Sequence, residues 1–273
     1  MVQTETLSKS LDETRALLQR KAPNVKVAEE AISNLDRLDE LVIDPSGEGL
    51  KEIIQIGRKL KREISEYGEC AHNMDSFLDQ LSEWVEERFM GNTHVVSGQR
   101  VEMQPIDTEG LILDIGGGGE GVVGKLNGKG VVAIDLYPSE LEETENEALK
   151  IVMDATDMKF VASSFEVATS FFTLLYVERE KQEKVFSEVH RVLKEKGVFL
   201  IWDVRIPVRV EGKPFFMVRL EIELPVETVS TGYGVRLAQQ DVEHFKELAA
   251  RTGFDVVGEW EKGEIFHLEL VKQ

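Results

Sequence analysis

The stretch "LILDIGGGGEG", residues 111–121, decides how the rest of the chain is interpreted. Apolar residues run into an acid and then into glycines, which is typical of a buried strand entering a tight ligand-binding loop. Gly116, Gly118 and Gly121 satisfy the G-x-G-x-x-G pattern of dinucleotide sites. Counted from Asp114, the same stretch gives acid-x-Gly-x-Gly, so the glycines alone leave two classes of cofactor open.

The acid at the end of this first strand favours the second class. Glycines let the backbone pass close to a ligand, and the amides that open the next helix face that ligand. In a dinucleotide site those amides hold a pyrophosphate, which the carboxylate of Asp114 would repel. The same carboxylate suits a cationic group, such as the α-amino group of an amino-acid-like cofactor.

From Leu111 onward, short apolar runs alternate with amphipathic segments. This alternation is typical of an α/β fold with a mostly parallel sheet and helices on both faces. Strands are predicted at 111–115, 131–135, 150–153, 166–171, 198–203, 254–260 and 264–271. Helices are predicted near 119–127, 139–148, 178–194 and 240–252, with Gly253 ending the last.

Residues 1–95 have a different pattern, in which apolar residues recur at spacings of three and four. These spacings predict an N-terminal extension of amphipathic helices, followed by a ligand-binding domain over 96–273. We expect the extension to cap the site, to form a homodimer surface or simply to support the fold. Residues 89–100 lose the helical period and are predicted to be a connecting loop.

Three further landmarks follow the glycines. Asp135 ends the second strand, where a carboxylate can accept both hydroxyl protons of a ribose. Asp154 and Ala155 end the next apolar run, where an acid and exposed backbone can bind the amino edge of adenine. The segment "EVHRVLKEKGVFLIWDV", residues 188–204, is typical of a helix, a basic turn and an apolar strand.

Asp114-x-Gly116-x-Gly118, Asp135, Asp154-Ala155 and "RVLKEKGVFLI" together resemble the class I S-adenosylmethionine-dependent methyltransferases. The order and spacing match over roughly 105–204, and the closing helix and strands at 240–271 also fit. The resemblance implies a Rossmann-like, seven-stranded sheet whose last strand is antiparallel. It implies S-adenosyl-L-methionine as the cofactor. The resemblance places the methionine moiety near Asp114, Gly116, Gly117 and Gly118, the ribose at Asp135, and the adenine at Asp154 and Ala155. Leu136 and Phe171 are the remaining cofactor-binding residues that it implies.

The sequence departs from the family pattern at one position, because Glu120 stands where the third glycine is usual. This carboxylate can hold the cofactor amine, hold a cationic substrate or point to solvent. We expect it to point to solvent, since helix N-termini accept acids without any functional role.

The resemblance predicts methyl transfer to a small molecule through an oxygen, sulfur or nitrogen nucleophile. The alternatives are a protein methyltransferase and a cofactor-binding module without activity. Phe171-Phe172-Thr173-Leu174 replaces the Asn/Asp-Pro-Pro-aromatic motif of the amide-methylating branches, which disfavours that chemistry. Candidate catalytic residues are His94, before the first strand, and Tyr176 and Asp203, which flank the expected substrate mouth.

Residues 205–239 are an unusual piece between the fifth strand and the last helix. Apolar and polar residues alternate around "EGKP", which predicts a β-hairpin that extends the sheet. A functional alternative is a lid whose Phe215, Phe216 and Tyr233 close an apolar pocket over the substrate.

Composition narrows the functional classes. A formal charge of −19 argues against a general electrostatic hold on nucleic acid. No window has the apolar length of a membrane span, so a cytoplasmic protein is expected. Cys70 is the single cysteine, which excludes an internal disulfide, and no residues have the spacing of metal ligands.

Overall fold

The computed structural model describes residues 91–273 and, before them, Asp12, Ala16, Ser33, Arg37 and Ile56. The chain divides into two compact units, Met1–Thr93 and His94–Gln273. The five described residues that precede position 91 are helical. The remaining predictions for residues 1–95, including a cap and a homodimer surface, lie outside the described residues.

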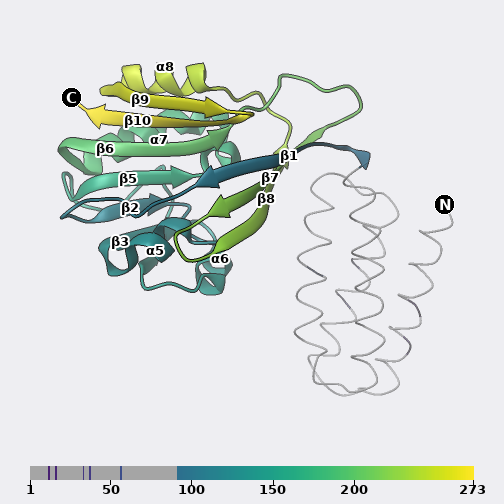
Figure 1. Cartoon of the computed structure of the whole chain (residues 1–273), viewed down its shortest axis with the longest axis horizontal. Helices are drawn as coiled ribbons and strands as arrows, with labels where there is room; N and C mark the ends of the chain where they lie inside the picture. The colour runs from purple at the N-terminus through teal and green to yellow at the C-terminus, as the bar shows by residue number, and fades with distance from the viewer. Residues whose placement is uncertain (1–11, 13–15, 17–32, 34–36, 38–55, 57–90) are drawn as a thin grey trace. The chain divides into compact units, whose positions relative to one another are not determined.

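A seven-stranded sheet in the order β4-β3-β2-β5-β6-β10-β9 forms the centre of the second unit (Figure 1). Neighbouring strands from β4 to β6 are parallel, whereas β10 is antiparallel to both β6 and β9. The predicted α/β class and the antiparallel last strand are confirmed. The strands are β2 (Ile112–Ile115), β3 (Val131–Asp135), β4 (Leu149–Val152), β5 (Phe165–Phe171), β6 (Leu193–Val204), β9 (Phe254–Lys262) and β10 (Ile265–Lys272).

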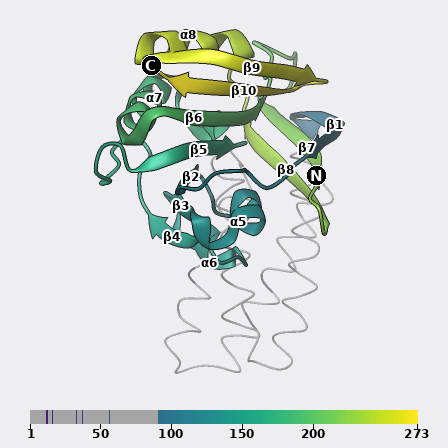
Figure 2. The same ribbon diagram turned by 60° about the vertical axis from the view of Figure 1, so that its left-hand side comes forward.

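Helices cover both faces of this sheet, as Figure 2 shows. On one face, α7 (Arg179–Val192) and α8 (Val242–Thr252) bury Phe186 and Phe245 in the largest apolar cluster. On the other face, α5 (Val122–Asn127) and α6 (Pro138–Glu143) pack through Val123 and Leu141. Two short 3₁₀ turns, η1 (Gly128–Gly130) and η2 (Leu174–Tyr176), complete the unit. No helix within the described residues is long and apolar enough to cross a membrane.

A second, three-stranded sheet in the order β1-β7-β8 lies apart from the first. It consists of β1 (Thr93–Glu102), β7 (Phe215–Glu223) and β8 (Thr228–Arg236). The prediction of a loop over 89–100 is therefore wrong for most of its length. The prediction of a hairpin that turns at "EGKP" and extends the main sheet is also wrong on both points, because β7 and β8 turn between Glu223 and Thr228 and join β1 instead. Alternate β7 residues, Phe216, Val218, Leu220 and Ile222, are buried against the main sheet near Trp202, which explains this packing.

The helix predicted over 139–148 is shorter than expected, because α6 ends at Glu143. Thr144 has an extended backbone, and its hydroxyl donates to the carbonyls of Gly119 and Glu140 at 2.9 and 2.7 Å. Asn146 also donates from its side chain to the carbonyl of Gly121, at 3.2 Å. The segment after α6 thus supports the glycine loop instead of continuing the helix.

Candidate functional site

The strand order places the candidate site at the carboxyl ends of β2 and β5. From β2 the chain proceeds to β3 and β4 on one side of the sheet, and from β5 to β6 on the other. Ligands of open α/β sheets bind outside the carboxyl ends of the strands at such a switch point. The glycine loop leaves β2 here, and the Phe171–Tyr176 segment leaves β5 beside it.

The glycine loop is tightly held between β3 and α6. The amides of Gly116 and Gly117 donate to the carbonyl of Ile134 at 2.8 and 3.1 Å, and the amide of Gly119 donates to that of Glu140 at 2.9 Å. Gly116 has φ +69°, and a β-carbon there would collide with the side chain of Thr173. A β-carbon on Gly117 would lie 2.6 Å from Oδ2 of Asp114. Only glycine fits these two positions.

Replacing Gly116 with Ala is therefore expected to destabilise the loop by about 1–2 kcal/mol from backbone strain alone, with the collision added. Thermal unfolding and titration with S-adenosylhomocysteine would both show the defect. Gly130→Ala is the matched control, because a β-carbon at Gly130 would meet nothing within 4 Å. Equal behaviour of the two variants would contradict this description of the loop.

Asp114 is buried beneath the glycines, with 3% of its surface exposed. The hydroxyl of Thr169, on the neighbouring strand β5, donates to its Oδ1 at 2.7 Å. Burial raises the pKa of Asp114 to about 7, the Thr169 hydrogen bond opposes the rise, and the charge of Asp135 adds to it. A desolvated carboxylate of this kind is stabilised by a cationic ligand group.

Asp135 ends β3 beside the glycine loop. The amide of Tyr137 donates to its Oδ1 at 2.9 Å. Its Oδ2 faces Gly118, since a β-carbon on that glycine would lie 2.9 Å away. Leu136 and Tyr137 follow with 56% and 62% of their surfaces exposed, so apolar surface lies next to the carboxylate.

Asp154 and Ala155 open a loop, residues 153–164, that has no helix or strand. The amide of Thr156 donates to Oδ1 of Asp154 at 2.8 Å, and hydrogen bonds from Thr156 lower the pKa of this exposed acid. Ala155 is half-buried against the main core. The structure thus brings Asp154 to the carboxyl end of β4, next to the end of β3.

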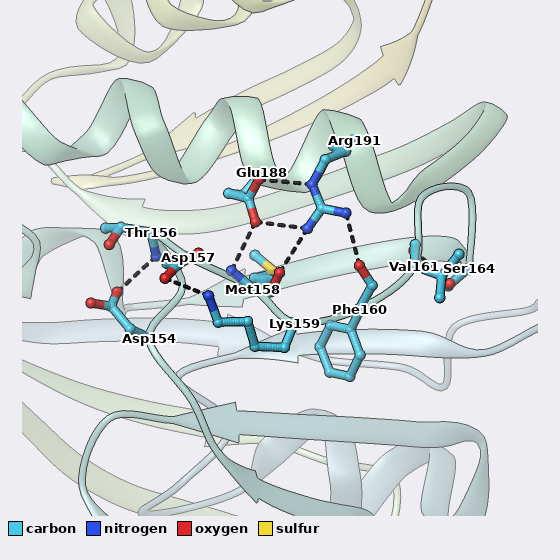
Figure 3. Close-up of polar contacts among 10 residues, drawn as sticks. All are labelled: Asp154, Thr156, Asp157, Met158, Lys159, Phe160, Val161, Ser164, Glu188 and Arg191. Atoms are coloured by element: carbon cyan, nitrogen blue, oxygen red, sulfur yellow. Dashed lines mark hydrogen bonds and ion pairs between the residues drawn. The ribbon is translucent and has the colours of Figure 1, made fainter.

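Two residues of α7 hold this loop in place (Figure 3). The guanidinium of Arg191 donates to the carbonyls of Met158 and Phe160, each at 2.8 Å. It also makes two hydrogen bonds to Glu188, whose Oε2 accepts the amide of Met158 at 2.8 Å. Sequence analysis did not identify this pair, because it lies on a helix 30 residues away from the loop.

The aromatic residues after β5 have different positions. Phe171 is 8% exposed and packs on Phe172 and Trp202, so its ring offers little surface to a cofactor. Phe172 has φ +49°, an uncommon conformation for a bulky residue, and its ring stacks on Tyr233 with centroids 5.2 Å apart. Tyr176 is 51% exposed, yet burial of its hydroxyl region raises its pKa to about 12.

Asp203 is fully buried, with none of its surface exposed. Its Oδ1 accepts hydrogen bonds from the amide of Val204 and from Nε2 of Gln240, both at 2.8 Å. The amides of Leu174 and Leu175 approach its other oxygen, which makes no hydrogen bond of good geometry.

His94 lies on β1, where a connecting loop was predicted. Its half-buried ring faces Phe216 of β7 at a centroid distance of 6.0 Å. The side chains that reach the glycine loop come from β8 instead, so nothing places His94 beside Asp114 or Tyr176.

Glu120 does not point to solvent, which corrects the sequence-based expectation. Its carboxylate accepts hydrogen bonds from Thr231 and, at 3.0 Å, from the hydroxyl of Tyr233. Both donors are on β8, 111 and 113 residues away. No local sequence pattern indicates this contact, because the hairpin was expected at the edge of the main sheet. Among the described residues, no three His, Cys, Asp or Glu side chains form a group that would hold a metal ion.

Comparisons with known proteins agree with this description. Residues 113–201 match the model of a family described as a methyltransferase domain. No curated protein matches the chain. Similar solved structures include an S-adenosylmethionine-dependent methyltransferase from Methanosarcina mazei (17% identity, 61% of this chain and 94% of that chain, TM-score 0.45). Another, from Clostridium acetobutylicum, shows 14% identity over 59% of this chain and 83% of that chain, with TM-score 0.43. The family match lies within the main sheet, from β2 to β6.

Proposed function

Residues 113–201 match a methyltransferase-domain family, and we propose that the chain is a class I S-adenosylmethionine-dependent methyltransferase that methylates a small molecule through an oxygen, sulfur or nitrogen nucleophile. S-adenosylmethionine is the cofactor, and its sulfonium supplies an activated methyl group. The observation that carries the small-molecule proposal is the contact of β8 with both loops at the switch point. A site covered in this way is suited to a small acceptor more than to a protein segment.

The residues around the loop fit the cofactor. Asp114 would accept the α-ammonium group, which offsets the cost of burying its carboxylate. The backbone at Gly116, Gly117 and Gly118 would pass close to the methionine moiety. Asp135 would accept the ribose hydroxyl protons, with Leu136 against the adenine ring. Asp154 and Ala155 would meet the amino edge of adenine, and Phe171 would support the site from the core.

Alignment, more than a strong base, is the expected source of catalysis. The bound cofactor would supply the methyl group, and the residues around the switch point would orient the acceptor toward it; orientation alone contributes up to about 7–11 kcal/mol in favourable systems. Tyr176, with a pKa of about 12, stays protonated near neutral pH and is therefore not available to accept a proton. Asp203 is fully buried, and His94 lies on the small sheet. A nucleophile that is neutral when it attacks would release its proton to water.

The acidic residues around Tyr176 bear on which charge the acceptor can carry. The hydroxyl of Tyr176 lies in the negative field of Glu120, Asp203 and Glu140, which adds to the rise of its pKa. An anionic acceptor would be repelled here, so neutral or cationic acceptors with an apolar portion are favoured.

Methyl-labelled S-adenosylmethionine tests this function directly. The purified protein would be incubated with neutral, cationic and anionic small acceptors and, separately, with unfolded and folded proteins. Transfer of label to a neutral or cationic small molecule is expected. If label appears in proteins alone, and the Asp135→Ala variant does not transfer it, the small-molecule proposal is wrong and the protein alternative replaces it.

A further inference from the structure

The hairpin strand β8 spans the two loops that meet at the switch point. Thr231 and Tyr233 are two residues apart, so both point to the same face of the strand, and both donate to Glu120 of the glycine loop. The ring of Tyr233 stacks on Phe172, with an interplanar angle of 9°. The backbone of Gly234 hydrogen-bonds the hydroxyl of Tyr176. Thr231, Tyr233 and Gly234 thus join β8 to the loops after β2 and β5.

These contacts hold a strand that is otherwise secured on one side. Within the described part of the chain, β8 is the outer strand of its sheet and pairs with β7 alone. Val218 and Leu220, the β7 partners of Tyr233 and Thr231, are buried. The carboxylate of Glu120 accepts hydrogen bonds from two hydroxyl groups, and hydrogen bonds to carboxylates are stronger than those between neutral groups.

We propose that Glu120 is a positioning residue that fixes β8 across the switch point, and that Thr231–Gly234 form the wall of the acceptor site beside the transferable methyl group. This deepens the proposed function and rests on it for the identity of the site. Glu120 occupies the position of the family's third glycine, where a glycine has no side chain to reach β8. The wall therefore depends on the residue that departs from the pattern.

The experiment compares Glu120→Ala, Glu120→Gln, Tyr233→Phe and the double variant with the full-length protein. Tyr233→Phe removes one donor and keeps the ring against Phe172. The control is Glu221→Ala, which removes an exposed carboxylate on β7 that pairs with Arg100. Deuterium uptake across 228–236 and the rates of S-adenosylhomocysteine association and dissociation are measured for each.

In Glu120→Ala, deuterium uptake in β8 is expected to be faster by about tenfold, the value of a hydrogen bond to a charged group. The dissociation rate of S-adenosylhomocysteine is expected to increase by a similar factor. Glu120→Gln keeps an acceptor oxygen and should fall between Glu120→Ala and wild type. The double variant, Glu120→Ala with Tyr233→Phe, should behave like Glu120→Ala, because Tyr233→Phe removes a hydrogen bond that Glu120→Ala has already removed.

Unchanged uptake in β8, or additive effects in the double variant, would overturn the role of Glu120. Faster deuterium uptake in β8 with unchanged rates of S-adenosylhomocysteine association and dissociation would overturn the proposal that Thr231–Gly234 form a wall of the acceptor site. A wild-type protein that binds no S-adenosylhomocysteine would instead refute the proposed function, and the uptake data would still decide the role of Glu120.

Discussion

Asp114→Asn is expected to weaken the binding of S-adenosylhomocysteine by about 10- to 100-fold near pH 8, because a charge-assisted hydrogen bond is lost. In wild type, burial raises the pKa of Asp114 to about 7. Below that value the free protein must release a proton before it binds an ammonium group. The affinity should therefore fall by up to about tenfold for each pH unit below 7 and stay level just above it. Asn at this position should remove that dependence.

Asp203→Asn is the matched control for this pH profile. Burial also raises the pKa of Asp203 to about 7, but its partners are Gln240, Val204 and the η2 backbone, not the glycine loop. Calorimetric titrations with S-adenosylhomocysteine between about pH 5.5 and 8 would compare the affinities of the two variants on both sides of the raised pKa values of Asp114 and Asp203. A slope that survives in Asp114→Asn and disappears in Asp203→Asn would contradict the assignment of the ammonium group to Asp114.

The raised pKa of Asp114 affects the stability of the unliganded protein in the opposite direction to its effect on ligand affinity. The unfolded chain keeps an ordinary aspartate pKa, so between about pH 4 and 7 the folded state binds more protons than the unfolded state. The contribution of Asp114 to stability is therefore largest at low pH and decreases as pH rises through about 7.

Arg191→Ala is expected to lower the free energy of unfolding by about 2–4 kcal/mol, because two backbone carbonyls and the half-buried Glu188 lose their charged donor. The loop that carries Asp154 should also exchange its amides faster, and affinity for S-adenosylhomocysteine should fall with it. Arg191→Lys should recover only part of the loss, since an ammonium group cannot reproduce the planar fork of a guanidinium. Chemical denaturation and hydrogen exchange would measure both effects.

The control for Arg191 lies on the same helix. Lys181 pairs with Glu178 at 2.8 Å, also three residues apart, and both side chains are more than half exposed. Lys181→Ala should cost less than about 1 kcal/mol, as exposed ion pairs do. If Arg191→Ala and Lys181→Ala destabilise equally, the Arg191 contacts to the loop contribute nothing beyond a surface pair.

The main sheet could be predicted from the sequence because its signals are local. Buried parallel strands such as Val131–Asp135 are continuous apolar runs, and the switch from strand to helix recurs along the chain. Gly253, with φ +87°, ends α8 as its position after the apolar period predicts. The small sheet could not be predicted, because the pairing of β1 with β7 joins residues more than a hundred positions apart.

The candidate site divides in the same way. Local sequence was enough to predict Asp114, Asp135 and the glycines, because acids and glycines at the ends of apolar runs are a recognisable pattern. The partners that fix them, Thr169 for Asp114 and Arg191 for the Asp154 loop, depend on which strand or helix lies alongside. Glu120 is the clearest case, because helix-terminus electrostatics favoured solvent, whereas a distant hairpin supplies its partners.

Calorimetric titration with S-adenosylhomocysteine, with NAD in parallel, is the most direct test of which cofactor the glycine loop binds. We expect binding of the first compound, weakened by about 100-fold in Asp135→Ala, and no heat from NAD. Binding of NAD alone, or binding of S-adenosylhomocysteine that Asp135→Ala leaves unchanged, would contradict this expectation.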